Sequence, residues 1–166
     1  LMKTAEQPVG WMAATDFLDN TGAESNFAQV AYLTVYYANV YGDKLKEAHL
    51  KVEYVGNKTQ EQLVLEMLMD GPIEELSDMR PTLSEGVKVN QVTTKDGICY
   101  VDFNSKFMEK RMSVTENVAV YSVVNSITNI NGIDKIMITV EGQVLDNYRG
   151  SVDLRQPLSF NKEILK

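Results

Sequence analysis

The sequence has very few of the residue types that form cross-links, bind metals or transfer protons at neutral pH. Its 166 residues include one cysteine, Cys99, and one histidine, His49. One cysteine excludes a disulfide within the chain, and a metal site usually needs several cysteine, histidine or carboxylate ligands at set spacings. We therefore expect no metal site and no cofactor, with Cys99 in the core and His49 at the surface.

Long apolar runs and an excess of positive charge are also missing. The longest apolar stretches, such as "LVLEMLM", fall far short of the ~20 residues that span a bilayer. The formal net charge is −7, which would repel a phosphate backbone, so nucleic acid is not an expected partner. No secretory leader is visible, and we expect the natural N-terminus to lie upstream of the polar segment that opens the chain.

The sequence shows no recognisable catalytic motif. A glycine-rich phosphate loop, a nucleophile elbow and a dinucleotide fingerprint are all missing. Acidic pairs such as Glu74-Glu75 occur, but a chain with 23 acidic residues contains such pairs by chance. We expect no catalytic residues and no enzyme activity, and hydrolysis by paired carboxylates is the weakest of the alternatives.

The composition, with 44% hydrophobic and 23% charged residues, is that of a folded globular chain. Residues 59–72, "TQEQLVLEMLMDGP", predict a helix that packs one apolar face on a sheet. Thr59 and Gln62 form a capping box at its start. Gly71 and Pro72 end it, because glycine adopts the left-handed conformation and proline cannot continue a helix.

A second long helix is expected to begin at a capping box of Ser113 and Glu116 and to end at Asn131-Gly132. A shorter helix is expected over residues 10–22. The tail from Leu154 onward shows no strong pattern.

Alternation of apolar residues predicts the strands. We expect strands at 33–38 and 50–55 with a turn at Gly42-Asp43, a hairpin of 87–92 and 98–103 around Lys95-Asp96-Gly97, and a strand at 135–145 that turns at Gly142. These elements favour an α+β fold, a two-layer sandwich with two main helices on one face of a mostly antiparallel sheet.

Tyrosines gather around the first predicted hairpin, at Tyr32, Tyr36, Tyr37, Tyr41 and Tyr54. Such residues fill cores, but exposed tyrosines also favour protein interfaces or sugar contacts. The pattern leaves both roles open, and Tyr36 and Tyr37 are the candidate contact residues.

An ordered set of short segments resembles the GerM domain of sporulation and spore-germination proteins. The segments are "TVYYAN", "LVLEMLMDGP", "RPTLSEGVKVNQV", "GICYVDFNSKF", "ENVAVYSVVNSIT" and "IDKIMITVEGQ", and the match runs from about Leu33 to Gly142. On this basis we expect an N-terminal segment at 1–30, a GerM-like domain at 31–153 and a C-terminal tail at 154–166. The motif residues are Gly71, Pro72, Pro81, Gly86, Asp102, Phe103, Glu116, Ser122 and Gly142.

Most of these residues have a structural explanation. The glycines serve turns, Phe103 serves the core, and Asp102 is expected to hold the loop after its strand through hydrogen bonds to the backbone. Glu116 and the loop "GPIEELSDMR", with Glu74 and Glu75, retain capacity to bind a partner.

The resemblance implies a non-enzymatic protein outside the cytoplasm, similar in fold to ring-building modules and held on the membrane by a lipid. The lipid-bearing cysteine of such proteins is not in this sequence, and one copy of the domain is present where some relatives have two. The implied role is scaffolding or assembly with other envelope or sporulation proteins, including a second copy of the chain. The alternative is a module that binds peptidoglycan or a small ligand.

Overall fold

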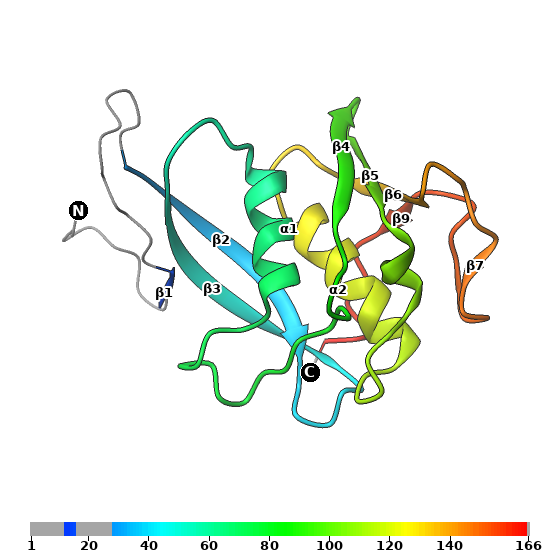
Figure 1. The fold of residues 1–166 in the computed structure, drawn as a ribbon, viewed down its shortest axis with the longest axis horizontal. Coiled ribbons are helices and arrows are strands. Elements are labelled where there is room, and N and C mark those ends of the chain that lie inside the picture. The colour runs from blue at the N-terminus through cyan, green and yellow to red at the C-terminus, as the bar shows by residue number, and fades with distance from the viewer. Residues whose placement is uncertain (1–11, 16–27, 166) are drawn as a thin grey trace.

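The computed structural model describes residues 12–15 and 28–165 (Figure 1). The strands and helices follow one another as β1 Met12–Thr15, β2 Gln29–Ala38, β3 Leu45–Tyr54, α1 Gln60–Asp70, β4 Val89–Lys95, β5 Ile98–Phe103, the 3₁₀ helix η1 Ser105–Met108, α2 Glu116–Thr128, β6 Lys135–Val140, β7 Asn147–Tyr148, β8 Val152–Asp153 and β9 Leu158–Ser159. Neither α-helix of these residues is long and apolar enough to cross a membrane.

The α+β class is confirmed, and the sheet is divided more finely than the sequence predicted. The described strands form one sheet in the order β1-β3-β2, another in the order β4-β5-β6-β9, and a short ribbon of β7 and β8. Most pairs are antiparallel, but β1 pairs with β3, and β5 with β6, in parallel. The second parallel pair arises because α2 carries the chain back between β5 and β6.

Other parts of the chain cover the C-terminal part of the outer edge of β2, which helps to keep the two sheets separate. The amide of Tyr36 donates to Ser126 Oγ of α2 at 2.9 Å. Ala38 and Arg80 exchange two backbone hydrogen bonds of 3.0 and 2.8 Å. An edge whose donors and acceptors are satisfied in this way cannot accept a further strand.

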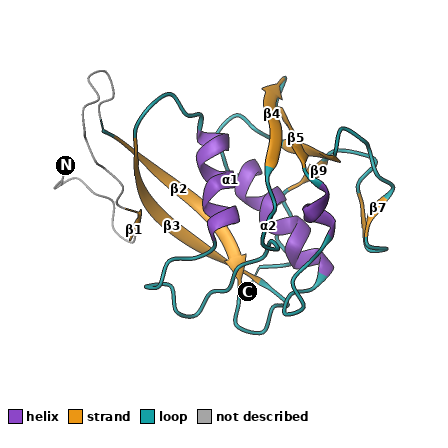
Figure 2. Cartoon of the chain, in the orientation of Figure 1, coloured by secondary structure: helices purple, strands orange, loops and turns teal. Residues whose placement is uncertain are grey.

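The two helices lie between the sheets and hold them together (Figures 1 and 2). Both contact β2 and each other, while α2 also contacts β6 and β9 and α1 also contacts β4. The core therefore runs continuously through both sheets. Three polar residues of α2, Ser122, Asn125 and Ser126, are fully buried, and each forms a hydrogen bond to a segment distant in sequence.

The predicted start and end of α1 are confirmed. Thr59 Oγ1 accepts from the Gln62 amide at 3.1 Å, and Gln62 Oε1 accepts from the Thr59 amide at 2.9 Å. At the other end, Gly71 has a φ of 85° and donates its amide to Met67 O at 3.0 Å. The hairpin between β4 and β5 is confirmed too, since Asp96 and Gly97 have φ of 54° and 81°, as a tight hairpin turn requires.

The predicted start of α2 is wrong by two residues. Thr115 is the N-cap, and its Oγ1 accepts from the Val118 amide at 3.2 Å. The amide of Thr115 in turn donates to Gly42 O at 3.0 Å. This contact with the β2–β3 loop fixes where the helix begins, which a local capping pattern cannot reveal.

The predicted N-terminal helix is wrong where it can be compared. Met12–Thr15 form β1, which pairs with the open edge of β3, and the rest of that prediction lies outside the described residues. Several strand boundaries also differ from the predictions, and β3 begins at Leu45 because the hairpin is longer than the apolar alternation indicates.

The C-terminal segment belongs to the packed structure, although its sequence shows no pattern. Its strand β9 pairs with β6, Ile164 is buried, and the amide of Leu45 donates to Ile164 O at 2.9 Å. Asn125 on α2 donates to Asn161 O and accepts from the Asn161 amide, both at 2.9 Å. Two-residue strand pairing and hydrogen bonds to a backbone leave little trace in a sequence.

Candidate functional site

The loop that follows α1, residues 71–81, is a defined structure and not a loose connection. It turns twice through backbone hydrogen bonds, from Leu76 to Ile73 O at 3.0 Å and from Met79 to Leu76 O at 3.1 Å. Leu76 and Met79 are buried, and Arg80 is joined to β2 as described above. The loop is therefore held at both ends and at its middle.

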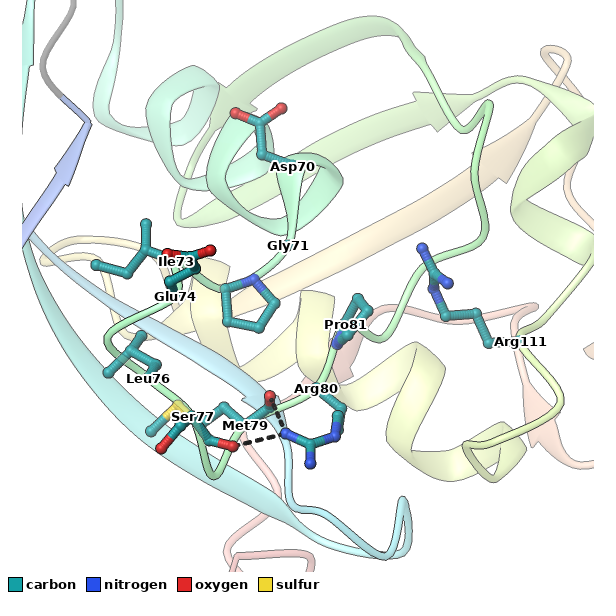
Figure 3. A pocket seen from close by; sticks show the side chains of 11 residues that line it. Asp70, Gly71, Ile73, Glu74, Leu76, Ser77, Met79, Arg80, Pro81 and Arg111 are labelled. Atoms are coloured by element: carbon teal, nitrogen blue, oxygen red, sulfur yellow. Dashed lines mark hydrogen bonds between the residues drawn. The ribbon is translucent and has the colours of Figure 1, made fainter.

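A cavity of about 290 Å³ lies beneath this loop (Figure 3). Its apolar lining includes Pro72, Ile73, Leu76 and Pro81. The structure thus brings three of the predicted positions, Gly71, Pro72 and Glu74, to one place.

Four charged residues line the same cavity, namely Asp70, Glu74, Arg80 and Arg111. Arg80 Nη1 donates to Ser77 O at 2.8 Å and Met79 O at 2.9 Å. Arg111 Nε donates to Leu83 O at 2.7 Å. Neither guanidinium pairs with a carboxylate among the described residues. Each therefore has an uncompensated positive charge and unused N–H donors.

A larger groove of about 780 Å³ runs between α1 and β4, and Gly86 lines it. Lys58 and Glu66 form an ion pair of 3.0 Å at this groove, and Asp70 lines both this groove and the smaller cavity. Burial, and then the charge of Glu66, raise the pKa of Asp70, which Lys58 opposes. The groove therefore has no single sign of charge with which to select a ligand.

Asp102 anchors the turn after β6. Its Oδ1 accepts from Thr139 Oγ1 at 2.6 Å and from the Gly142 amide at 2.8 Å, and its Oδ2 accepts from Asn90 Nδ2 at 3.0 Å. Burial raises the pKa of this carboxyl, but the three hydrogen bonds outweigh burial and hold the pKa below its usual value. The residue has a structural role, but the turn that it holds is the one after β6 and not the loop after its own strand β5, and two of its three partners are side chains.

Glu116 lies in the first turn of α2, where a negative charge stabilises the helix. It does not line the cavity beneath the 71–81 loop, although Arg111, which does, lies in the segment just before α2. Glu75 is exposed beside Glu74 but likewise does not line that cavity. The predicted positions therefore do not form one site.

The comparison with protein families decides the identity. The Germane model, described as sporulation and spore germination, matches residues 34–146. The chain belongs to the Germane family. The resemblance seen in the sequence is confirmed, and so is the fold that it implied.

Solved structures share the fold of this Germane domain. The tandem GerMN domains of the sporulation protein GerM from Bacillus subtilis are 22% identical with a TM-score of 0.68, over 93% of this chain and 52% of that one. The chain thus spans about half of the tandem structure. The first GerMN domain of GerM alone is 21% identical with a TM-score of 0.57, over 80% of this chain and 98% of that one.

A candidate lipoprotein from Clostridium perfringens is also similar, at 22% identity and a TM-score of 0.56, over 90% of this chain and 94% of that one. No curated protein matches the chain.

The Germane fold places Tyr36 and Tyr37 in the interior, so neither is available to contact a partner. They are 3% and 1% exposed. Tyr37 Oη donates to Met67 O of α1 at 3.0 Å, and burial raises the pKa of both phenols. The ring of Tyr36 meets Phe160 edge-on at 5.7 Å, which shows that the C-terminal segment covers the face of β2 that the sequence left open.

Other expectations about single residues are confirmed. Cys99 is fully buried, and burial raises the pKa of its thiol to about 11, so it remains protonated at neutral pH. Phe103 is also fully buried and stacks on Phe107 with ring centres 4.3 Å apart. Ser122, a motif residue for which the sequence offered no specific role, donates its one hydroxyl proton to Ala119 O at 2.9 Å and accepts from the Thr82 hydroxyl at 2.8 Å.

Sequence reasoning missed Arg111, did not single out Arg80 within the loop that it named, and chose Tyr36 and Tyr37 over Tyr41 among the clustered tyrosines. Arg80 lies in the loop already singled out, but nothing local shows that Arg111 returns to the same cavity. Tyr41 is 81% exposed. Its position in the turn of the hairpin, not in a strand, was the available signal.

We expect Asp102→Asn to lower the free energy of unfolding by about 1–2 kcal/mol at neutral pH, because an amide cannot accept all three hydrogen bonds and the site is partly solvated. The folded pKa of Asp102 is lowered, so its stabilisation is present above the unfolded pKa of about 3.9 and is lost as pH falls through the folded pKa. Urea titrations at pH 7 and at the lowest pH where the protein stays folded should show the difference from wild type shrinking with acid. Glu85→Gln, which removes an exposed carboxylate, should show almost no change at either pH.

Proposed function

We propose that this Germane domain is a non-enzymatic assembly module of the cell envelope, acting in sporulation or germination by binding another protein domain. The observation that carries the proposal is an exposed apolar surface formed by Val40, Tyr41 and Met112, called here the loop patch. These side chains are 47%, 81% and 94% exposed. Tyrosine and methionine are enriched in protein interfaces, and exposed apolar clusters mark interaction sites.

The loop patch is built from two segments that are far apart in sequence but in contact in space. Gly42, next to Tyr41, accepts a hydrogen bond from the Thr115 amide at 3.0 Å, and its α-carbon lies against the carbonyl of Ser113. Figure 1 shows the β2–β3 loop beside the segment that leads into α2. The two segments that carry Tyr41 and Met112 are therefore adjacent in the fold and joined by a backbone hydrogen bond.

The partner that we propose for the loop patch is a second Germane domain. The support is the structure from Bacillus subtilis, which holds two GerMN domains in tandem, one of which corresponds in extent to this chain. Because two such domains occur in one chain there, a second Germane domain is the simplest candidate for a surface that fits the loop patch. The similar protein from Clostridium perfringens, described as a candidate lipoprotein, supports a location outside the cytoplasm with a lipid anchor in the parent protein.

We expect the wild-type chain to self-associate reversibly, and Tyr41→Ser combined with Met112→Ser to weaken that association at least tenfold, since loss of interface anchors costs about 1–2 kcal/mol each. Light scattering and sedimentation over a concentration series measure the effect. Val144→Ser is the matched control, because Val144 is 56% exposed in a different loop. It should leave the association unchanged.

A strictly monomeric wild-type chain at about 1 mM, where an interface of about 4 kcal/mol would be half-occupied, would contradict pairing with a second copy. Equal weakening by Val144→Ser would show that general surface hydrophobicity, and not the loop patch, drives the association.

A further inference from the structure

Two arginines that lie in different segments of the chain, Arg80 and Arg111, both line the cavity beneath the 71–81 loop. Figure 3 shows their guanidinium groups on either side of Pro81, with the carboxylate of Glu74 directed away from both. Among the described residues, Lys46, Lys58, Lys106 and Arg155 each pair with a carboxylate, Lys46 with Asp78 at 2.5 Å. The two cavity arginines are bonded to backbone carbonyls alone.

The donors that remain on these arginines are arranged for a carboxylate. A guanidinium has five N–H donors in a fixed planar fork. Arg80 uses the two donors of Nη1, which leaves the adjacent Nε and Nη2 edge. Arg111 uses Nε, which leaves both terminal nitrogens. Each arginine therefore keeps one pair of parallel donors, the geometry that binds both oxygens of a carboxylate.

The surroundings favour an anion of low charge. Asp70 and Glu74 line the same cavity, so a dianion would be repelled more than a single carboxylate. The cavity of about 290 Å³ is at the small end of the range for ligand sites, about 300–1,000 Å³. It has room for one residue with its terminal group and not for a long segment.

The remaining lining is apolar. Pro72, Ile73, Leu76 and Pro81 supply it, so a ligand that carries an apolar group beside its carboxylate would contact both kinds of surface. A peptide C-terminus has this combination, since its last residue holds the α-carboxylate and a side chain on one carbon. Capture of terminal carboxylates by clustered donors is a recurring mode of peptide recognition.

We propose that this cavity binds the free C-terminal carboxylate of a protein partner whose last side chain is apolar. Arg80 and Arg111 hold the carboxylate, and the prolines with Ile73 and Leu76 cover the side chain. Arg80 is bonded to two carbonyls of the 71–81 loop and Arg111 to Leu83 O, so both side chains are held before binding, which reduces the ordering cost. The site is separate from the loop patch and does not depend on self-association.

The probe is the tripeptide acetyl-Ser-Ala-Leu, titrated into the full chain as its free acid and as its C-terminal amide, with binding followed by NMR shifts and calorimetry. The free acid should bind at least tenfold more tightly than the amide, because the amide loses the charge-assisted pair of hydrogen bonds. Arg111→Gln should weaken the acid at least tenfold and leave the amide unchanged. Arg111→Lys should recover only part of the loss, since lysine lacks the planar fork.

The neighbouring glutamates provide a matched pair of variants. Glu74 lines the cavity and Glu75 does not. Glu74→Gln should strengthen binding of the free acid about two- to threefold by removing a like charge, while Glu75→Gln should change it little. If Arg111→Gln weakened binding only by disturbing the fold, removal of the charge on Glu74 would not strengthen binding.

Three results would overturn the proposal. Equal binding of acid and amide would show that no carboxylate is recognised. Displacement of the peptide by an equal concentration of inorganic phosphate would show a general anion site. Tighter binding of the same peptide ending in a D-residue would point to a cell-wall stem peptide instead of a protein partner. None of these results bears on self-association, so the two proposals can fail independently.

Discussion

Replacing Gly42 by alanine is expected to lower the free energy of unfolding by about 3–5 kcal/mol, among the largest effects of any single substitution in this chain. Gly42 has a φ of 74°, where a side chain is strained, and an added β-carbon would overlap the carbonyl oxygen of Ser113. The neighbour is backbone and cannot rotate away. The loop before α2 would have to move, and the hydrogen bond from Thr115 to Gly42 would be lost with it.

Gly132→Ala is the control that separates strain from overlap. Gly132 has a φ of 91°, but nothing lies within 4 Å of its added β-carbon. It should therefore cost only the strain of the left-handed conformation, about 1–2 kcal/mol. Chemical denaturation of both variants gives the comparison. Equal losses would show that the contact between Gly42 and Ser113 contributes nothing to stability.

The second large effect is expected at Asn125. Asn125→Ala should lower the free energy of unfolding by about 2–4 kcal/mol, because it removes a fully buried side chain and both of its hydrogen bonds to the part-buried backbone of Asn161. Both hydrogen bonds are 2.9 Å long. The same variant should expose the C-terminal segment to proteolysis, since this side chain ties that segment to α2.

Two substitutions test whether the effect comes from these bonds. Asn161→Ala keeps the backbone groups that Asn125 contacts, so it should cost less than about 1 kcal/mol. Asn129→Ala removes an exposed asparagine from the end of the same helix and should also cost little. If Asn161→Ala were as damaging as Asn125→Ala, the side chain of Asn161, and not its backbone, would carry the stability.

The stabilities of these contacts bear on the proposed function. Gly42 joins the two segments that present Tyr41 and Met112, so Gly42→Ala should weaken self-association as well as folding. Asn125 lies away from the loop patch in the chain and is completely buried. It reaches the patch only indirectly, through the C-terminal segment whose Ile164 O accepts from the Leu45 amide, so its loss should weaken self-association less than Gly42→Ala does. Comparing the two variants under conditions where both remain folded would separate the roles.

Short-range sequence patterns were sufficient to predict several structural elements correctly. The capping box of Thr59 and Gln62, the stop at Gly71-Pro72 and the turn at Asp96-Gly97 were all predicted correctly. Each depends on residues no more than a few positions apart, whose backbone preferences act wherever the segment lies. The α+β class followed from these elements, and the order of short motifs was enough to predict the family.

The tyrosines show that short-range sequence patterns do not predict which side chains are buried. Alternation correctly put Tyr37 on the buried face of β2, but Tyr36 is buried as well because Phe160 covers the other face. Tyr41, in the turn after β2, is exposed to solvent. The same pattern of residues therefore contains core and surface members, and only packing of the C-terminal segment distinguishes them.

The sequence by itself determined the class of fold, both ends of α1, the hairpin of β4 and β5 and the Germane family, since these depend on short-range patterns and on the order of motifs. The tertiary structure alone decided which side chains reach solvent, which edge of β2 is covered, and that Arg80 and Arg111 meet at one cavity. The reason is physical: burial and convergence are set by contacts between distant segments, such as the bond from Tyr36 to Ser126 across 90 positions. No preference of a single segment contains that information.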